Sequence, residues 1–188
     1  MVEVNSKELL SKRRVSINGW LCGTNLVEPE KSFEVSKYTV NIAFPSADEA
    51  TYLEIQTAMR NAFNMKREEL FVNGVEAKFE DAITPIRYDD EFEGLCFLRA
   101  TRRSKPNPTD NDYKNINLAS EPVWGAEGNI SVLFRCCKIN GIIRIFATLD
   151  NVQIISNKNH LEELLSFSPK EDFEKFSGNN EASHKEIG

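Results

Sequence analysis

The stretch WGAEGNISVLFRCCKINGIIRIFATLDNVQII, residues 124–155, decides the fold of this chain. Apolar and polar side chains alternate from Ile130 to Cys137, as in a strand with one buried face. Asn140-Gly141 follows, and a second β-rich run extends from Ile142 to Ile155. An Asn-Gly pair between two such runs is a strong hairpin signal, because both central residues of a type I′ turn need φ > 0. The stretch therefore predicts a long antiparallel hairpin.

Three earlier segments alternate in the same way and predict the rest of a sheet. Gly19 lies inside the first of them and predicts a bend or bulge, of the kind that barrels use to curl. Residues 23–36 are predicted to be a polar connection between the first two strands. The five predicted strands are residues 14–22, 37–44, 94–103, 130–139 and 142–155.

One helix is predicted between the second and third strands. Ser46-Ala-Asp-Glu49 has the spacing of a capping box, and apolar side chains recur at helical spacing over residues 47–64. Short strands or turns are predicted around Phe71–Val75 and Ala77–Phe79. The fold class predicted from these elements is mainly β with one helix: a five-stranded barrel followed by a disordered C-terminal tail.

Length and charge set the expected domain organisation. With 188 residues, one domain plus a tail is the natural expectation. We predict an N-terminal arm over residues 1–13, the barrel over 14–156 and a flexible acidic tail over 157–188. The net charge of −6 argues at first against a nucleic-acid partner. Half of that charge lies in residues 156–188, however, which hold seven acids and four lysines. Basic residues cluster elsewhere, at 12–14 and 99–105.

Cysteine usage and hydropathy indicate a cytoplasmic protein. No apolar run approaches the roughly 18 residues of a membrane span, and residues 1–14 lack the apolar core of a signal peptide. The four cysteines show no C-x-x-C spacing and have no histidine nearby, so buried thiols are expected and a metal site is not.

Motifs for catalysis are largely absent from the sequence. It has no Walker A phosphate loop, no G-x-G-x-x-G, no H-E-x-x-H and no G-x-S-x-G, so neither an enzyme nor a cofactor is expected. The acids between Asp89 and Glu93, with Asp81 upstream, leave a metal-dependent nuclease as an alternative. A solvated acidic loop is the simpler interpretation of that cluster. A β-rich protein–protein adaptor is the third alternative.

Arginines and aromatic residues alternate along several predicted strands. Proteins that bind single strands without sequence preference need cations for phosphates and exposed rings on which bases stack. Several of these residues have a structural alternative. Trp20 and Phe146 are then core residues, and Trp124 fills one end of the barrel. Arg102 and Arg103 then form ion pairs with the acids of residues 89–93. The residues expected to bind DNA are Trp20, Tyr38, Arg99, Arg102, Arg103, Lys105, Tyr113, Lys114, Trp124, Arg135, Lys138, Arg144 and Phe146.

The order of several short motifs resembles a known family, the OB-fold single-stranded DNA-binding proteins of tailed-phage replication systems. Each motif alone is weak, but their order and spacing over residues 14–155 are fairly specific. The motifs are Lys37–Phe44 followed by Pro45, Pro85–Asp90 (PIRYDD), Phe97–Arg103 with Lys105-Pro106, Glu121–Gly125 (EPVWG), and Gly141 to Val152 with the following Gln153.

This resemblance implies a protein that coats and protects single strands during phage-type DNA replication and recombination, with a further role in DNA repair. It also implies a tail that contacts replication enzymes such as a polymerase or a helicase-primase, here through Phe173 and Phe176. A homodimer is a further assembly to consider, and no membrane partner is expected. Two features depart from the pattern: the tail is only mildly acidic with its aromatics well before Gly188, and the helix follows the second strand.

Overall fold

The computed structural model describes residues 10–31, 35–72 and 74–161. The predictions for Phe173, Phe176 and most of the N-terminal arm lie outside these residues. The elements are β1 (Arg14–Glu30), β2 (Lys37–Pro45), α2 (Glu49–Asn64), η1 (Arg67–Glu69), β3 (Phe71–Val72), β4 (Val75–Glu76), η2 (Phe79–Asp81), β5 (Ile86–Tyr88), β6 (Leu95–Arg102), β7 (Ala126–Ile139) and β8 (Ile142–Ser156).

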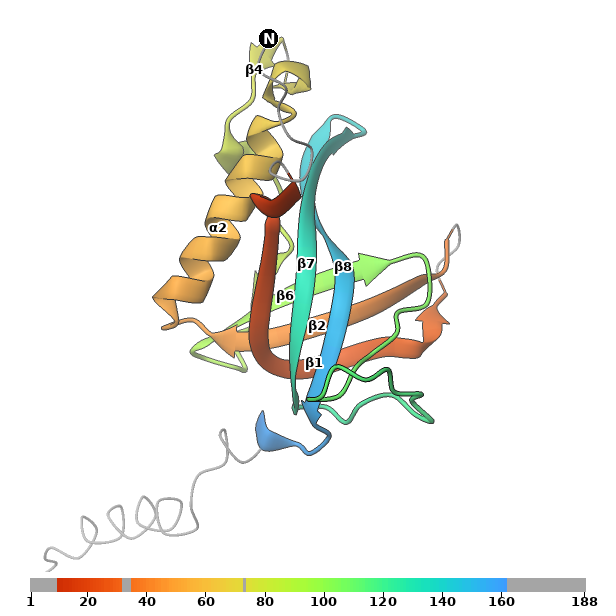
Figure 1. Cartoon of the computed structure of the whole chain (residues 1–188). Coiled ribbons are helices and arrows are strands. Elements are labelled where there is room, and N and C mark those ends of the chain that lie inside the picture. The colour runs from red at the N-terminus through yellow and green to blue at the C-terminus, as the bar shows by residue number, and fades with distance from the viewer. Residues whose placement is uncertain (1–9, 32–34, 73, 162–188) are drawn as a thin grey trace, which may run out of the picture.

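Five strands close into a barrel in the order β1–β2–β6–β8–β7 and back to β1 (Figure 1). All of these pairings are antiparallel except the contact between β6 and β8, which is parallel. The helix α2 lies between β2 and β6 in the chain, as predicted. The predicted fold class, a five-stranded OB-type barrel with one helix, is therefore confirmed.

The predicted hairpin is the longest ladder of the barrel. Ile139 pairs with Ile142 across the turn, in which Asn140 has φ +50° and Gly141 has φ +80°. These are the left-handed conformations that an Asn-Gly turn supplies at low cost. A register shift around Asp150 then bends β8, so that it can follow the curvature of the barrel.

The first strand is longer than predicted, and the connection expected over residues 23–36 is wrong for its first part. Residues 23–30 continue β1 beyond a register shift between Leu21 and Thr24. Gly23 lies at this shift with φ +98°, a conformation that a residue with a Cβ rarely adopts. Figure 1 shows the result: β1 bends sharply, so that it pairs with β7 on one side of the barrel and with β2 on the other.

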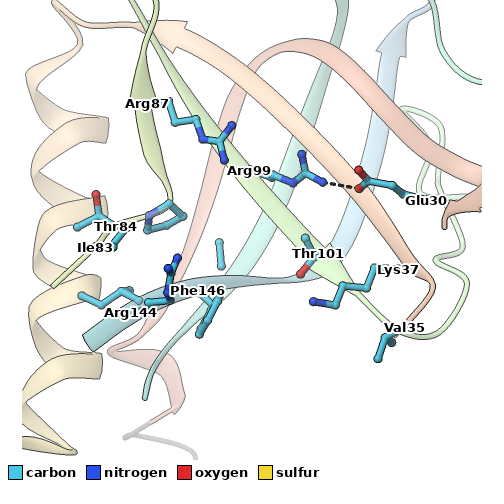
Figure 2. A pocket seen from close by; sticks show the side chains of 13 residues that line it. Glu30, Val35, Lys37, Ile83, Thr84, Arg87, Arg99, Thr101, Arg144 and Phe146 are labelled. Atoms are coloured by element: carbon cyan, nitrogen blue, oxygen red, sulfur yellow. Dashed lines mark hydrogen bonds and ion pairs between the residues drawn. The ribbon is translucent and has the colours of Figure 1, made fainter. Parts of the chain in front are cut away.

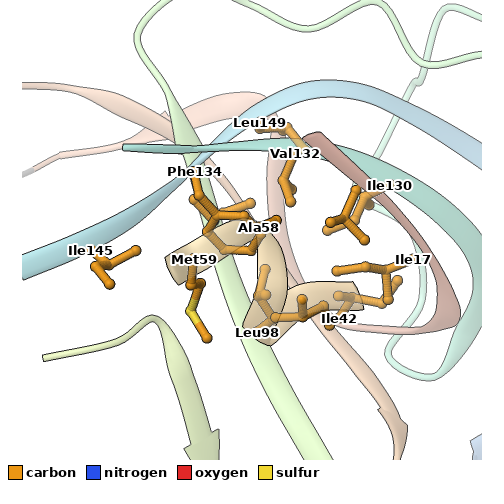
Figure 3. Close-up of a cluster of buried hydrophobic side chains, with 14 of the residues drawn as sticks. Ile17, Ile42, Ala58, Met59, Leu98, Ile130, Val132, Phe134, Ile145 and Leu149 are labelled. Carbon is orange, nitrogen blue, oxygen red and sulfur yellow. The ribbon is translucent and has the colours of Figure 1, made fainter. Parts of the chain in front are cut away.

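The core fills the barrel from all five strands and from α2 (Figure 3). Alternation along each strand places one set of side chains inside, among them Ile17 on β1 and Phe134 on β7, both fully buried. The helix adds Ile55, Met59 and Phe63 from its predicted apolar face. One contiguous cluster results, so the barrel and helix form a single cooperative unit.

The helix begins differently from the sequence prediction. The N-cap is Asp48, whose carboxylate accepts a hydrogen bond from the Thr51 N–H (3.1 Å). This hydrogen bond lowers the pKa of Asp48, because it favours the charged form. Ser46 instead donates its hydroxyl to the Gly94 carbonyl (3.0 Å), which joins the start of the helix to the turn before β6.

A short segment fills the gap that the barrel leaves between β6 and β8. Only Ala100 and Thr101 of β6 pair with β8, so the first half of β6 has a free edge on that side. Residues 86–88 pair with this edge as β5. Ile83 exchanges backbone hydrogen bonds with β8, to the Ile143 carbonyl (2.9 Å) and from the Ile145 N–H (2.8 Å). Residues 83–88 thus bridge β6 and β8 where these two strands do not pair with each other.

The cysteines are free thiols, and those of Cys96 and Cys136 are buried. Burial raises the pKa of Cys136 to about 11. Within residues 10–31, 35–72 and 74–161, no group of three His, Cys, Asp or Glu side chains could hold a metal ion. None of the helices in those ranges is long and apolar enough to cross a membrane.

Replacing Gly19 by alanine tests the close packing of β1 on β2. A Cβ at Gly19 would lie 2.1 Å from the backbone oxygen of Ala43, so the two strands would have to separate. We expect Gly19→Ala to lower the free energy of unfolding by about 2–4 kcal/mol in urea denaturation. Gly94→Ala is the control, since its Cβ meets nothing within 4 Å and only its φ of +85° is unfavourable, which costs about 1–2 kcal/mol. Equal losses in the two variants would contradict this account.

Candidate nucleic-acid interface

A hollow of about 330 Å³ lies on the outer surface of the barrel, between β6 and β8 and beside residues 83–87. Strand ends that are distant in the sequence meet there, as Figure 2 shows. Its lining residues are Glu30, Val35, Lys37, Ile83, Thr84, Pro85, Arg87, Arg99, Thr101, Arg144, Ile145, Phe146 and Ala147. We call this hollow the cationic groove.

Four basic side chains line the groove, each from a different strand. On β6, Leu98 and Ala100 point into the core, so Arg99 and Thr101 must point outward. The same alternation turns Arg144 of β8 outward, beside the buried Ile143 and Ile145. The other two cations are Lys37 at the start of β2 and Arg87 on β5.

A single carboxylate faces these cations within the groove lining. The Arg99 guanidinium forms an ion pair with Glu30, drawn as a dashed line in Figure 2. Glu30 is also the register partner of Lys37 across β1 and β2. Among the residues that the structure describes, Lys37, Arg87 and Arg144 form no ion pair. The groove therefore carries a local excess of positive charge, although the chain as a whole is acidic.

Phe146 supplies an aromatic ring among the cations. It lies on the outer face of β8 and is 39% exposed, although a phenylalanine in a sheet is usually buried. Its cross-strand partner is Arg135 of β7, which is exposed, and Arg144 lies two residues away on the same face. A partly exposed ring between guanidinium groups is suited to stack on a base whose phosphates meet the cations.

A second aromatic cluster lies further along the outer face of the same strands. Trp20 of β1 is next to Ala43 of β2, and Ala43 is next to Phe97 of β6. The Phe92 ring lies 5.7 Å from that of Phe97 and 5.7 Å from that of Trp124. Trp20 and Phe97 pack with the fully buried Leu161. Trp20 and Trp124 thus lie outside the cationic groove, but Phe97 is only two residues from Arg99 on β6.

The other predicted site residues are spread around the barrel. Tyr38 and Arg102 pair with each other on the opposite face of their strands from Arg99, and Arg102 donates to the Asp150 carbonyl (3.0 Å). Arg103 and Lys105 are exposed in the loop after β6, and Tyr113 and Lys114 are exposed further along that loop. Lys138 lies near the tip of the β7–β8 hairpin and donates to the Phe71 carbonyl.

Three charged groove residues were not among the sequence candidates: Glu30, Lys37 and Arg87. Lys37 begins the motif KYTV, and Arg87 lies between Ile86 and Tyr88 in the motif PIRY. A basic residue next to a β-branched or aromatic run would have been a usable signal for both. Glu30 gave no such signal, because only the bend in β1 brings it to Arg99.

The loop that leads into β7 is attached to β1 through one carboxylate. Glu121 accepts backbone hydrogen bonds from Leu26 (2.7 Å) and Val27 (2.6 Å), and a hydroxyl hydrogen bond from Thr24 (2.8 Å). Partial burial opposes ionisation of this carboxyl, but the hydrogen bonds outweigh burial and lower its pKa. Glu121 thereby holds the far half of β1, which ends in Glu30, against the body of the barrel.

The acids from Asp89 to Glu93, which suggested a nuclease, lie in a turn between β5 and β6. Asp89 accepts a hydrogen bond from the Glu91 N–H (3.0 Å), and the residues from Asp89 to Glu91 are exposed. The carboxylate of Asp89 thus shapes the turn itself. This arrangement is typical of a solvated loop.

A closed five-stranded barrel with a cationic, aromatic outer groove is the architecture of OB-fold proteins that bind single-stranded nucleic acid. The family model described as "Enterobacter phage Enc34, ssDNA-binding protein" matches residues 24–184. This chain belongs to that family of phage single-stranded DNA-binding proteins. No curated protein matches the chain significantly.

Solved structures share the fold. The single-stranded DNA-binding protein from bacteriophage Enc34 in complex with ssDNA has a TM-score of 0.59 and 14% identity, over 77% of this chain and 87% of that chain. The gp2.5 single-stranded DNA-binding protein encoded by bacteriophage T7 has a TM-score of 0.60 and 12% identity, over 84% of this chain and 99% of that one. Neither the nuclease nor the adaptor alternative finds support in these matches.

Replacing Glu121 by glutamine tests the attachment of the loop to β1. The amide would turn an N–H₂ group toward backbone N–H donors, so we expect Glu121→Gln to cost about 2 kcal/mol of unfolding free energy at pH 7. Because the folded-state pKa of Glu121 is lowered, its contribution is present above the unfolded pKa of about 4.3 and is lost as pH falls through the folded value.

Thermal melts at pH 7 and near pH 3 measure the effect. The difference between wild type and Glu121→Gln is expected to shrink at the acid end. Glu91→Gln is the matched control, because its carboxylate is exposed and it should melt like the wild type at both pH values. A difference between wild type and Glu121→Gln that persists unchanged in acid would rule out the carboxylate as its source.

Proposed function

We propose that this protein binds single-stranded DNA in the cationic groove with little sequence preference, and that it coats single strands in phage DNA replication. The observation that carries the proposal is the convergence of Lys37, Arg87, Arg99 and Arg144 around the exposed ring of Phe146. Membership of the phage family supports the same substrate.

The groove would bind through two physical terms. Cations that meet phosphates release condensed counterions, so the affinity falls as salt rises. Stacking of a base on Phe146 adds a term of about 1–3 kcal/mol that tolerates every base, because each has a flat face. Neither term requires a reactive group, and we propose that the protein acts without catalysis and leaves the strand intact.

The remaining candidate residues would extend the path of the strand. The cluster of Trp20 and Trp124 adjoins the groove along β6, and Arg135 adjoins it across β7. We propose further contacts at Tyr38, Arg102, Arg103, Lys105, Tyr113, Lys114 and Lys138.

The biological role is proposed from the family. Coating protects single strands during replication and recombination, and also during repair. Residues 1–13, 14–156 and 157–188 are proposed as arm, binding domain and tail, with Phe173 and Phe176 of the tail contacting a polymerase or a helicase-primase. We also propose the host cytoplasm as its location, and a homodimer as a possible assembly to test by its mass in solution.

Two groove variants separate the electrostatic and stacking terms. Arg144→Ala should weaken binding of a labelled dT oligonucleotide severalfold and make the slope of log K against log salt shallower by about 0.7, since one phosphate contact is lost. Phe146→Ala should weaken binding about tenfold with an unchanged slope. Fluorescence anisotropy at about 50 and 200 mM salt measures both quantities.

Arg67→Ala is the control for net charge. It removes a cation whose partner is Glu76, away from the groove, and should bind like the wild type. The proposed function is wrong if the wild type does not bind the oligonucleotide. It is also wrong if Arg67→Ala and Arg144→Ala weaken binding equally, or if the strand is cleaved in the presence of Mg²⁺.

Removing the Glu30 carboxylate should have the opposite effect to removing a cation. DNA phosphate must displace Glu30 from Arg99, and the carboxylate then repels the strand. We expect Glu30→Gln to bind dT severalfold more tightly. The slope of log K against log salt should be steeper by about 0.7, because Arg99 is no longer paired with Glu30 and its contact with a phosphate then releases one more counterion. Glu76→Gln is the matched control. Weaker binding by Glu30→Gln would mean that the carboxylate positions Arg99 for DNA instead of competing with it.

A further inference from the structure

A second hollow, of about 520 Å³, lies on the outer wall of β1, β7 and β8, and it differs from the cationic groove in chemistry. None of its lining residues is acidic or basic. They are Ser16, Ile17, Asn18, Thr109, Tyr113, Asn129, Ile130, Ser131, Asn151, Val152 and Gln153. A site with no cation is poorly suited to hold phosphate, so its ligand should be a neutral polar group.

The floor of this hollow is a ladder of amides across three strands. Asn18, Asn129 and Gln153 are successive cross-strand partners on β1, β7 and β8. The Asn18 amide donates to the Asn129 oxygen (2.8 Å), and the Asn129 amide donates to the Gln153 oxygen (2.7 Å). Each rung uses one N–H of its amide, so a second N–H on each remains available. The ladder is therefore a fixed row of hydrogen-bond donors.

The last rung of the ladder also holds the loop that carries Tyr113. Gln153 donates its amide to the backbone carbonyl of Asp110 (3.1 Å). The Asp110 carboxylate accepts the N–H groups of Asp112 (2.9 Å) and Lys114 (3.0 Å), which closes a tight turn. Thr109 anchors the turn to β8 through backbone hydrogen bonds with Val152 (3.0 Å) and Ile154 (2.9 Å).

This turn holds an aromatic ring in solvent at a cost in backbone energy. Tyr113 is 81% exposed, and its φ of +61° is a conformation that residues with a Cβ adopt rarely. Asparagine or glycine would fit this φ with less strain. An unfavourable backbone that presents a large exposed ring beside a row of amides indicates that the ring has a binding role.

We propose that this hollow is a nucleobase-reading site, in which a base stacks on Tyr113 and places its edge on the amide ladder. The inference rests on the proposed function, since the base would belong to a strand already held in the cationic groove. Both sites use the outer face of β8, and Phe146 and Gln153 are seven residues apart, roughly 20 Å along a strand. A bound strand of several nucleotides can therefore reach both.

The ladder predicts which bases are preferred. Each of the three amides keeps one N–H, whereas only the Asn18 oxygen accepts no bond within the ladder, so donors outnumber acceptors and match the carbonyl oxygens of thymine. Adenine presents an amino group where thymine has a carbonyl oxygen, and that donor faces donors. The site should therefore add a modest preference for thymine to binding that is otherwise insensitive to sequence.

Variants of Tyr113 test the stacking role without disturbing the fold. Tyr113→Asn keeps the turn, because asparagine tolerates a positive φ, and its melting temperature should equal or exceed that of the wild type. We expect it to bind dT about tenfold more weakly with an unchanged salt slope, whereas Tyr113→Phe should bind like the wild type. Equal dT affinity in Tyr113→Asn and the wild type would overturn the proposal.

Asn18→Ala tests the reading of the base edge. Asn18 is exposed at the end of the ladder, so its removal leaves the hydrogen bonds from Asn129 to Gln153 and from Gln153 to Asp110 in place. We expect the ratio of dT affinity to dA affinity to be about threefold lower in Asn18→Ala than in the wild type. The stacking of bases within free dA strands does not affect this comparison, because both proteins are measured with the same strands. An unchanged ratio would overturn the reading of the base.

The two failures are distinguishable. If the wild type binds neither strand, the proposed function fails and this site fails with it. If the wild type binds dT and Arg144→Ala weakens it while Tyr113→Asn does not, only the nucleobase-reading site is wrong.

Discussion

Closure of the barrel is the constraint on which the rest of the structure depends. Once five strands are paired in a ring, every second side chain must fill the interior, and the others must face solvent. The interior row is almost wholly apolar and buried. The exterior row can therefore carry polar and aromatic side chains without cost to the core, and both candidate sites are built from it. Arg99 and Phe146 face outward for the same reason that Leu98 and Ile145 are buried.

In the function that we propose, the two outer surfaces bind different parts of a single strand. The groove between β6 and β8 concentrates positive charge in a protein whose net charge is −6, so it acts through a local field that the total charge conceals. The wall of β1, β7 and β8 carries no charge among the residues of its hollow and offers amides and one ring. Phosphates and bases differ in the same way, one charged and one neutral, and the barrel presents a surface suited to each.

Much of this could be predicted from local patterns. Alternation and the Asn140-Gly141 turn gave the hairpin, and apolar spacing gave the helix, because both depend on neighbours in the sequence. The prediction was wrong for residues 23–30, since their strand is stabilised by Glu121, which lies 95 residues after Leu26 and 94 after Val27. It was also wrong in the helix cap, where Asp48 replaces Ser46 because Ser46 is bonded to the turn before β6. Both errors occurred where a distant partner outweighed a local preference.

The sequence by itself determined which side chains share a strand face, but it left open whether Phe146 faces the core or the solvent. Which of these faces meet was decided only by the tertiary structure, because it depends on where β1 bends and on how residues 83–88 fill the gap between β6 and β8. That arrangement gathered Lys37, Arg87 and Glu30 into the groove and left Trp20 with Trp124 in a neighbouring cluster. Periodicity is a property of one strand, whereas a binding site is a property of several strands in register.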